Sequence, residues 1–138
     1  MRVKLDEGAF VPTRSYDTDG GIDIRSCQYG RVMSRSSSVF RTGTHVEIPK
    51  GYSGLLVSKS GLNIKHKIFA ISGLVDEGYT GEIKVRLYND SNEDYLIEPG
   101  DKIVQMVLIP VSYEEVEIVD EISGGARGDY GFGSTGKK

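Results

Sequence analysis

The segment Gly73–Gly81, which reads GLVDEGYTG, separates two runs that predict β-strands. The preceding run, Ile68–Ile71, is apolar, and the following run, Ile83–Tyr88, alternates apolar and polar residues. Two such runs joined by a glycine-rich stretch predict a β-hairpin. Glycines let a ligand approach bare main chain, so a tip that also carries Asp76 and Tyr79 indicates a small-molecule site.

A plainer interpretation fits the same stretch. Asp, Gly and Tyr are ordinary residues of hairpin turns, and a surface tyrosine needs no ligand to explain it. The hairpin residues taken alone therefore leave both a binding site and a simple turn open.

Length and cysteine content limit the kind of protein. With 138 residues the chain fits one domain that buries about two thirds of its unfolded surface without disulfides. Cys27 is the only cysteine, which excludes a disulfide framework and a thiolate zinc cluster and fits a reducing compartment. The N-terminus has no apolar signal region and no apolar run approaches ~20 residues, so we expect a cytoplasmic protein without a membrane segment.

Charge and residue pattern point to the fold class. The net charge is -3 and the charges of both signs are mixed, which argues against a nucleic-acid partner. The chain has 18 glycines and many short β-branched or aromatic runs, with no long stretch of helical period. We therefore expect an all-β, jelly-roll-like sandwich.

Short runs along the chain predict the individual elements. A short helix is expected after Ser58 or Ser60, either of which has a hydroxyl that can cap a helix. Residues 102–109 are apolar on both faces and should form a buried strand. Further strands are expected at residues 2–5, from Ile22 on, at 38–41, 44–48, 55–57 and 113–119.

Several polar residues are candidates for ligand contact. Gln105 interrupts the apolar run and must be hydrogen-bonded, either to core backbone or to a ligand. Lys59, between two serines at the expected helix start, would suit an anion, although a capped turn explains it equally. Gly20 and Gly21 fit a turn that opens the strand holding Asp23.

The histidines do not indicate a metal site. His45 and Glu47 match half of a zinc deaminase signature, but that chemistry also needs a pair of cysteines, which this chain lacks. We exclude zinc and expect His45 and His66 to be surface or packing residues.

The C-terminal residues differ sharply from the rest in composition. Gly131–Lys137 fits G-x-x-x-x-G-K, but Lys138 stands where a P-loop needs Ser or Thr. Exposed glycine amides and the donors nearby would nevertheless suit phosphate. We expect a jelly-roll domain at residues 1–122 and a flexible phosphate-binding tail at 123–138 that a ligand orders, although a linker-like terminus has the same composition.

Five segments resemble, in the same order, the five motifs of the trimeric dUTP diphosphatases (dUTPases). Each motif is short, but the ordered set spans residues 20–136, nearly the whole chain, and is highly specific. The segments are GGIDI (20–24), SKSGL (58–62), GLVDEGYTG (73–81), GDKIVQ (100–105) and RGDYGFGSTG (127–136).

The resemblance implies an enzyme that hydrolyses dUTP to dUMP and diphosphate, keeping uracil out of DNA and supplying dUMP for thymidylate synthesis. It implies a jelly-roll homotrimer with active sites shared between subunits. Asp76 matches the carboxylate that holds and activates the attacking water, chiefly by positioning it. Tyr79 matches the ring that stacks under the sugar and excludes a 2′-hydroxyl. The main chain around residues 71–75 would pair with uracil and exclude a 5-methyl group.

The same resemblance implies the remaining contacts. Mg²⁺ would sit on the triphosphate oxygens and waters, with Asp23 at most a neighbour through water. Phe132 matches the ring that closes over uracil, and the other tail residues match contacts to the terminal phosphate. The implied substrate-binding set is Lys59, Ser60, Gly61, Ile71, Gly73, Val75, Tyr79, Gln105, Arg127, Phe132, Gly133, Ser134 and Thr135.

Four positions depart from the family pattern. Ile22 replaces the usual Tyr of the first motif, and Asn63 and Lys67 replace small residues after SGL. Lys59 replaces the commoner Arg. A lysine is a point charge without the bidentate fork of arginine, which predicts weaker phosphate binding without loss of activity.

Two other functions are compatible with the same scaffold. A relative that deaminates dCTP shares the jelly roll, but its hairpin carries a glutamate base and is not expected to have Tyr-Thr-Gly with this tail. A non-catalytic binding protein, or a dUTPase that also binds a regulatory protein such as a repressor, is the second. Asp76 and the complete tail favour catalysis, whereas the sequence does not reveal a further partner.

Overall fold

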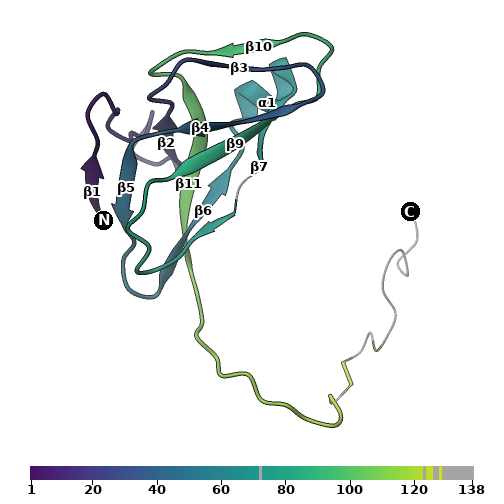
Figure 1. Cartoon of the computed structure of the whole chain (residues 1–138). Helices are drawn as coiled ribbons and strands as arrows, with labels where there is room; N and C mark the ends of the chain where they lie inside the picture. Colours follow the sequence, from purple (N-terminus) through teal and green to yellow (C-terminus); the bar gives the residue numbers. More distant parts are fainter. Residues whose placement is uncertain (72, 123, 126–127, 129–138) are drawn as a thin grey trace.

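The computed structural model describes residues 1–71, 73–122, 124–125 and 128. This part of the chain is built almost entirely from short β-strands (Figure 1). One short helix, α1 (Ser60–His66), interrupts them. The strands are β1 (Arg2–Leu5), β2 (Ile22–Arg25), β3 (Gly30–Val32), β4 (Ser37–Arg41), β5 (Thr44–Glu47), β6 (Tyr52–Val57), β7 (Ile68–Ile71), β8 (Leu74–Val75), β9 (Lys84–Asn89), β10 (Tyr95–Ile97) and β11 (Lys102–Pro110).

Two antiparallel sheets form the body of the fold. One has the strand order β2-β11-β6-β8 and the other β4-β9-β7. Two smaller pairs, β1-β5 and β10-β3, complete the strands. Figure 1 shows β4 and β9 crossing in front of β11 and β6. This arrangement confirms the expected all-β, jelly-roll-like fold.

The alternation of side chains along each strand builds the core. In β9, Val85 and Leu87 are buried while Lys84 and Arg86 face solvent, as the two-residue period of a strand requires. The buried cluster draws on both large sheets and excludes water from a largely aliphatic interior. It contains Ile22, Ile24, Val32, Phe40, Val46, Ile48, Leu56, Ile68, Val75, Ile83, Val85, Leu87, Ile97, Ile103, Val104 and Met106.

The central strand β11 is the buried strand that the sequence predicts at residues 102–109. It pairs with β2 on one side and β6 on the other. Ile103, Val104 and Met106 are buried in it. Because β11 joins these two strands, it places the polar residues of β2 beside those that follow β6.

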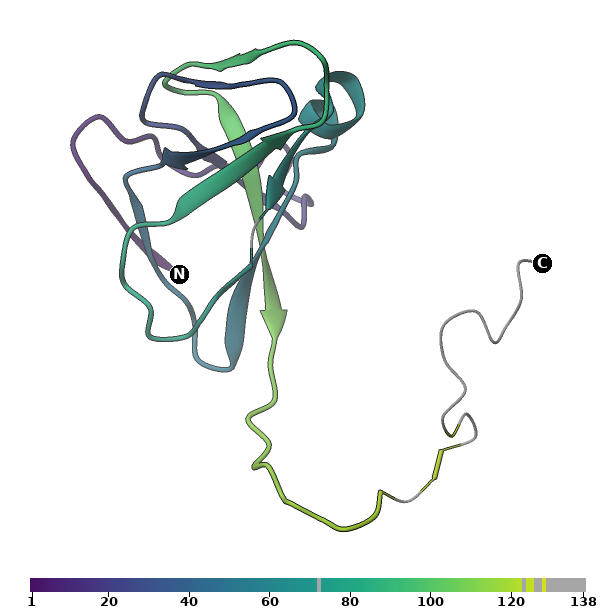
Figure 2. The ribbon, with the colours of Figure 1, turned by 45° about the vertical axis from the view of Figure 1, so that its right-hand side comes forward.

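The strand expected at residues 113–119 is wrong. This segment runs as irregular chain away from the body of the fold, as both views show (Figures 1 and 2). Val116 and Ile118 are 94% and 96% exposed. The alternating pattern favours a strand, but a strand needs a neighbour, and the described residues of this single chain provide none. The division at residue 122 stays a prediction.

The helix begins differently from the expectation. Its N-terminal flanking residue is Lys59, and no side chain caps it. The Ser58 hydroxyl instead donates to the Ala70 carbonyl oxygen and accepts from the Ala70 amide, which ties the start of the helix to β7. The helix ends at Lys67, which adopts φ 57°.

Candidate functional site

The hairpin tip joins the two large sheets. β7 pairs with β9, whereas β8 pairs with β6 through Val75 and Gly54. The chain then turns at Asp76, where the Tyr79 amide donates to the Asp76 carbonyl at 3.1 Å. Of the hairpin glycines, Gly78 takes a positive φ, 86°, which closes this turn.

A cavity of about 480 Å³ opens beside this turn. Its volume is in the range of small-molecule sites. Asp76 and Tyr79 are both exposed to solvent at the hairpin. Five residues predicted for the site therefore line one cavity. The lining consists of Val39, Leu56, Ile71, Gly73, Leu74, Val75, Asp76, Tyr79, Glu82, Ile83, Lys84 and Arg86.

The second carboxylate of the tip, Glu77, is engaged elsewhere. Its Oε2 accepts from the Tyr113 hydroxyl at 2.5 Å and from the Gly51 amide at 2.8 Å. The Tyr113 hydrogen bond, together with that of Gly51, lowers the pKa of Glu77 below its ordinary value. Glu77 does not line the described cavity, so of the two carboxylates at the turn Asp76 is the one that lines it. Glu82, further along the segment, also lines the cavity and is paired with Arg41.

A second polar group lies at the opposite end of β6. Lys59 Nζ contacts Asp23 Oδ1 at 2.9 Å, and Lys102 Nζ contacts Asp23 Oδ2 at 2.6 Å. Gln105 Nε2 donates to Asp23 Oδ1 at 3.1 Å. Gln105 is therefore bonded to a side chain of the first motif, an alternative to backbone or ligand that the sequence analysis did not consider. Gly21 makes room for it, since a Cβ there would lie 3.2 Å from Gln105.

Asp23 is the centre of this group. Its side chain is only 2% exposed. Burial by itself would raise the pKa of Asp23, but hydrogen bonds and charge from Lys102 and Lys59 outweigh it and hold the pKa below the ordinary value. Asp23 is therefore an ionised counter-ion that fixes both lysines.

The two groups are far apart within one chain. Val75 pairs with Gly54, so Asp76 follows toward Ser53, whereas Lys59 lies six positions after Ser53, two residues beyond the end of β6. At the rise of an extended strand this is about 20 Å. The described lining of the hairpin cavity contains none of Lys59, Ser60, Gly61 or Gln105. One chain alone therefore does not bring Asp76 and Lys59 to the same phosphate group.

The structure bears on metal binding through the available ligands. Each Asp23 oxygen already contacts a lysine ammonium, which disfavours direct coordination of a further cation by this carboxylate. Among the described residues, no three His, Cys, Asp or Glu side chains gather as a metal site.

The predicted tail contacts cannot be placed. Arg127, Phe132, Gly133, Ser134 and Thr135 lie outside the described residues.

No helix in the described part of the chain is long and apolar enough to cross a membrane.

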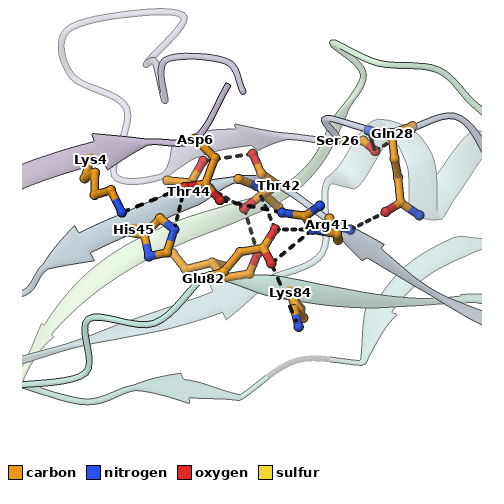
Figure 3. A network of polar contacts seen from close by, with 12 residues as sticks. Lys4, Asp6, Ser26, Gln28, Arg41, Thr42, Thr44, His45, Glu82 and Lys84 are labelled. Carbon is orange, nitrogen blue, oxygen red and sulfur yellow. Dashed lines mark hydrogen bonds and ion pairs between the residues drawn. The ribbon is translucent and has the colours of Figure 1, made fainter. Parts of the chain in front are cut away.

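A polar network behind the hairpin is not predicted by the sequence pattern (Figure 3). His45 contacts both Thr80 and Asp6, and Arg41 contacts both Asp6 and Glu82. These residues come from segments distant in sequence. The sequence signal was limited to the alternation of residues 44–48, which gives no partner for His45.

Comparison with known proteins identifies the family. A family model described as dUTPase matches residues 7–136. The deoxyuridine 5′-triphosphate nucleotidohydrolase of Clostridium acetobutylicum is 39% identical over 137 residues, covering 98% of this chain and 94% of the relative. The protein of the same name from Paramecium bursaria Chlorella virus 1 is 38% identical, covering 96% of this chain and 94% of the relative.

Solved structures agree in fold. A Staphylococcus bacteriophage 80alpha dUTPase with dUPNHPP has a TM-score of 0.91 and 32% identity, covering 98% of this chain and 97% of that one. A mutant dUTPase from phage phi11 of S. aureus, described as coordinating a structural Mg(II) ion, has a TM-score of 0.83 and 29% identity, covering 89% of this chain and 98% of that one. The chain therefore belongs to the dUTPase family.

Proposed function

We propose that this chain hydrolyses dUTP to dUMP and diphosphate, and so keeps uracil out of DNA and supplies dUMP for thymidylate synthesis. Family membership supports this function across nearly the whole chain. The observation that carries it is the cavity beside the hairpin, where Asp76 and Tyr79 line one small-molecule-sized space.

Asp76 is the proposed catalytic residue. An exposed carboxylate at the cavity can accept both hydrogens of a water and hold its oxygen toward phosphorus. Correct placement of the nucleophile converts an encounter between two molecules into a step within one complex, which is a large part of many enzymes' rate advantage. No covalent intermediate is required.

The hairpin also provides specificity in this proposal. The Tyr79 ring lies under the deoxyribose and leaves no room for a 2′-hydroxyl. The main chain of Ile71, Gly73 and Val75 faces the uracil edge and leaves no room for a 5-methyl group. A rigid steric block of this kind discriminates more strongly than a missing methylene, which is worth only about 1–3 kcal/mol.

In this proposal the phosphates are bound by Lys59, Ser60, Gly61 and Gln105, and the tail closes over the bound substrate. Lys59 is already fixed by Asp23 at 2.9 Å, so its position is set before substrate arrives. The tail residues add Phe132 over uracil and, with Arg127, Gly133, Ser134 and Thr135, contacts to the phosphates. Exposed glycine amides and hydroxyls suit this role.

Mg²⁺ is proposed as the cofactor, held by the triphosphate oxygens and water. When bound, it neutralises charge on the phosphates. Lys59 and Lys102 both pair with the Asp23 carboxylate. Asp23 would therefore influence phosphate binding by holding the two lysines, and would approach the ion at most through a water. This arrangement suits an ion that is reluctant to lose its water shell.

The proposed assembly is a homotrimer with shared sites, and the separation of the two groups supports sharing between subunits. Asp76 and Lys59 of one chain are about 20 Å apart along β6, too far to act on the same phosphate group. A neighbouring subunit would bring the lysine group of one chain to the hairpin of another. The cytoplasmic location, the lack of a nucleic-acid partner and any regulatory protein partner stay predictions.

The test is diphosphate release with dUTP, dCTP, dTTP and UTP, for the parent chain and Asp76→Asn. We expect turnover of dUTP alone, and binding without turnover in Asp76→Asn, because the amide keeps the shape but cannot activate water in the same way. Dissociation constants for a non-hydrolysable dUTP analogue check that binding survives. Ammonia release from dCTP, measured in parallel, or substantial dUTP turnover by Asp76→Asn would contradict the proposal.

A further inference from the structure

The back of the hairpin is held by His45, which does not line the described cavity. His45 lies in β5 with its side chain 18% exposed. Its Nε2 lies 3.2 Å from Asp6 Oδ1 (Figure 3). Its Nδ1 lies 2.9 Å from the carbonyl oxygen of Thr80. Thr80 directly follows Tyr79, so the ring of His45 contacts the segment that carries the proposed sugar-site residue.

The direction of the first contact is fixed by chemistry. A backbone carbonyl oxygen can only accept, so Nδ1 carries the hydrogen and donates it to Thr80. Asp6 faces the opposite side of the imidazole and is itself near Arg41, at 3.6 Å, and Lys4, at 3.9 Å. The ring is therefore held from both sides, and Thr80 and Asp6 together determine its orientation.

The other end of the segment is held by the same network. The Tyr79 hydroxyl donates to the Glu82 carbonyl oxygen at 3.0 Å. The Glu82 carboxylate accepts from the Gly43 amide and from Arg41, both at 3.0 Å. Residues 79–83 lie outside the strands, so these bonds take over the positioning that a sheet would provide.

We propose that His45 is a positioning residue for sugar discrimination. It fixes the Thr80 carbonyl and thereby the place of the Tyr79 ring. This inference rests on the proposed function, in which that ring excludes a 2′-hydroxyl. A steric gate depends on where the ring stands, and misplacement by about 1 Å at a site can change rates greatly. Loss of the His45 contact should therefore affect UTP rejection and not stability alone.

The test uses a pair of variants with nearly the same shape. Leucine and asparagine both branch at Cγ, but asparagine retains an N–H donor close to the place of Nδ1. His45→Leu removes the bond to Thr80, and His45→Asn preserves it. His66→Leu is the matched control, because the other histidine is exposed on α1 and packs against Tyr95 at 5.0 Å between ring centroids.

Two quantities are measured on the full-length protein. The first is the ratio of kcat/KM for dUTP to that for UTP. The second is hydrogen exchange at two backbone amides of the segment. The Tyr79 amide donates to the Asp76 carbonyl oxygen at 3.1 Å, and the Ile83 amide donates to the Thr44 carbonyl oxygen at 2.9 Å. In His45→Leu we expect the ratio to fall by about three- to tenfold, the range set by loss of one net hydrogen bond, with faster exchange. His45→Asn should stay closer to the parent, and His66→Leu should not change.

The outcomes separate this inference from the proposed function. An unchanged ratio in His45→Leu, with normal or faster exchange, overturns the specificity role. Equal losses in His45→Leu and His45→Asn overturn the hydrogen bond as its cause. Tyr79→Ala is measured in parallel. If its ratio of kcat/KM for dUTP to that for UTP is unchanged, the assignment of Tyr79 to the sugar site has failed. Hydrogen exchange at the Tyr79 and Ile83 amides then decides by itself whether His45 positions the hairpin. If His45→Leu does not fold, His45→Ala takes its place against His45→Asn.

Discussion

Tyr79 combines a free ring face with a fixed hydroxyl. The side chain is 47% exposed and lines the cavity, while its hydroxyl bonds to Glu82. Gly81 is needed beside it, because a Cβ at that position would overlap the phenol ring. The third motif thus supplies an aromatic surface and also the glycine that lets the ring fold back.

Replacing this ring should relax sugar selection. We expect Tyr79→Ala to raise UTP hydrolysis relative to dUTP, because the proposed block to a 2′-hydroxyl is removed. Tyr79→Phe keeps the ring as a steric block and loses only the positioning hydrogen bond to Glu82, so we expect a smaller rise in UTP hydrolysis than in Tyr79→Ala. Steady-state kcat/KM for both nucleotides gives the ratio, and an unchanged ratio in Tyr79→Ala would refute the sugar-gate role.

Gln105 and His45 show which side-chain contacts can and cannot be predicted from the sequence. A polar Gln105 in an apolar strand predicts a hydrogen bond, but its partner depends on the pairing of β2 with β11. His45 likewise looked like a surface or packing residue, because its contacts, Asp6 and Thr80, lie 39 and 35 positions away. Such contacts follow from strand register and are not visible in local pattern.

The charge of Asp23 should make stability depend on pH. Its pKa is lower in the folded chain than the ordinary value of 3.8, so the unfolded chain binds the proton more readily. The contribution of the Asp23 carboxylate to the free energy of unfolding is therefore complete above about pH 4. It declines as the pH falls below that value and disappears below the folded-state pKa of Asp23. We expect Asp23→Asn to be less stable by about 1–3 kcal/mol at pH 7, less than for a fully buried pair because both lysines are partly exposed.

Urea denaturation at one protein concentration measures this difference. The difference in the free energy of unfolding between the parent and Asp23→Asn should become smaller between pH 7 and pH 3. The other carboxylates titrate alike in both proteins and do not contribute to this difference. Asp90→Asn is the matched control, because Asp90 pairs with Arg35 at the surface and should change stability by less than about 1 kcal/mol. A deficit that stays constant across this pH range would show that the carboxylate charge is not its cause.

At the scale of elements, local pattern predicted most strands but not the edges of sheets. The two runs around the third motif do form the β7-β9 pair, with Ile71 opposite Arg86. β8, only two residues long, joins the other sheet, and its partner in β6 lies far away in sequence. Residues 113–119 show the converse case, in which a strand pattern has no partner within the described chain.

Close packing between strands gives a prediction at this scale. In β3, a Cβ at Gly30 would lie 2.7 Å from Cε1 of Phe40, a stiff ring that is 1% exposed. Gly30→Ala should therefore destabilise the fold by about 1–3 kcal/mol through overpacking. Gly20→Ala is the control, since nothing lies within 4 Å of its added Cβ and its φ is not positive. Similar thermal midpoints for the two variants would contradict this packing argument.

At the scale of the whole molecule, the proposed site is divided. The hairpin cavity and the Asp23 group lie at opposite ends of β6. After Tyr113, which bonds to Glu77, the chain leaves the body of the fold with Val116 and Ile118 exposed. Burial of such apolar side chains is favourable, so this segment favours contact with another subunit over solvent. The sequence motifs name the proposed members of the site, and the proposed division among subunits depends on how the chains assemble.

A mixing experiment tests this division. One protein carries Asp76→Asn, and the other ends at Gly125 and so lacks the tail. If a site takes its hairpin from one subunit and its tail from another, a truncated chain can supply the hairpin and a full-length mutant chain the tail. Random assembly of equal amounts gives one half times one half, so about a quarter of the sites should be intact in a closed symmetric trimer.

The result depends on the path of the tail and not on subunit mixing alone. Each protein by itself should hydrolyse dUTP only at background, because every site lacks either Asp76 or the tail. The co-refolded mixture should recover about a quarter of the parent activity, and native mass spectrometry should show the mixed trimers. If the tail folded back on its own hairpin, every site would retain one defect. Inactive mixtures with confirmed mixed trimers would therefore exclude a site shared between hairpin and tail, whereas activity near a quarter would require it.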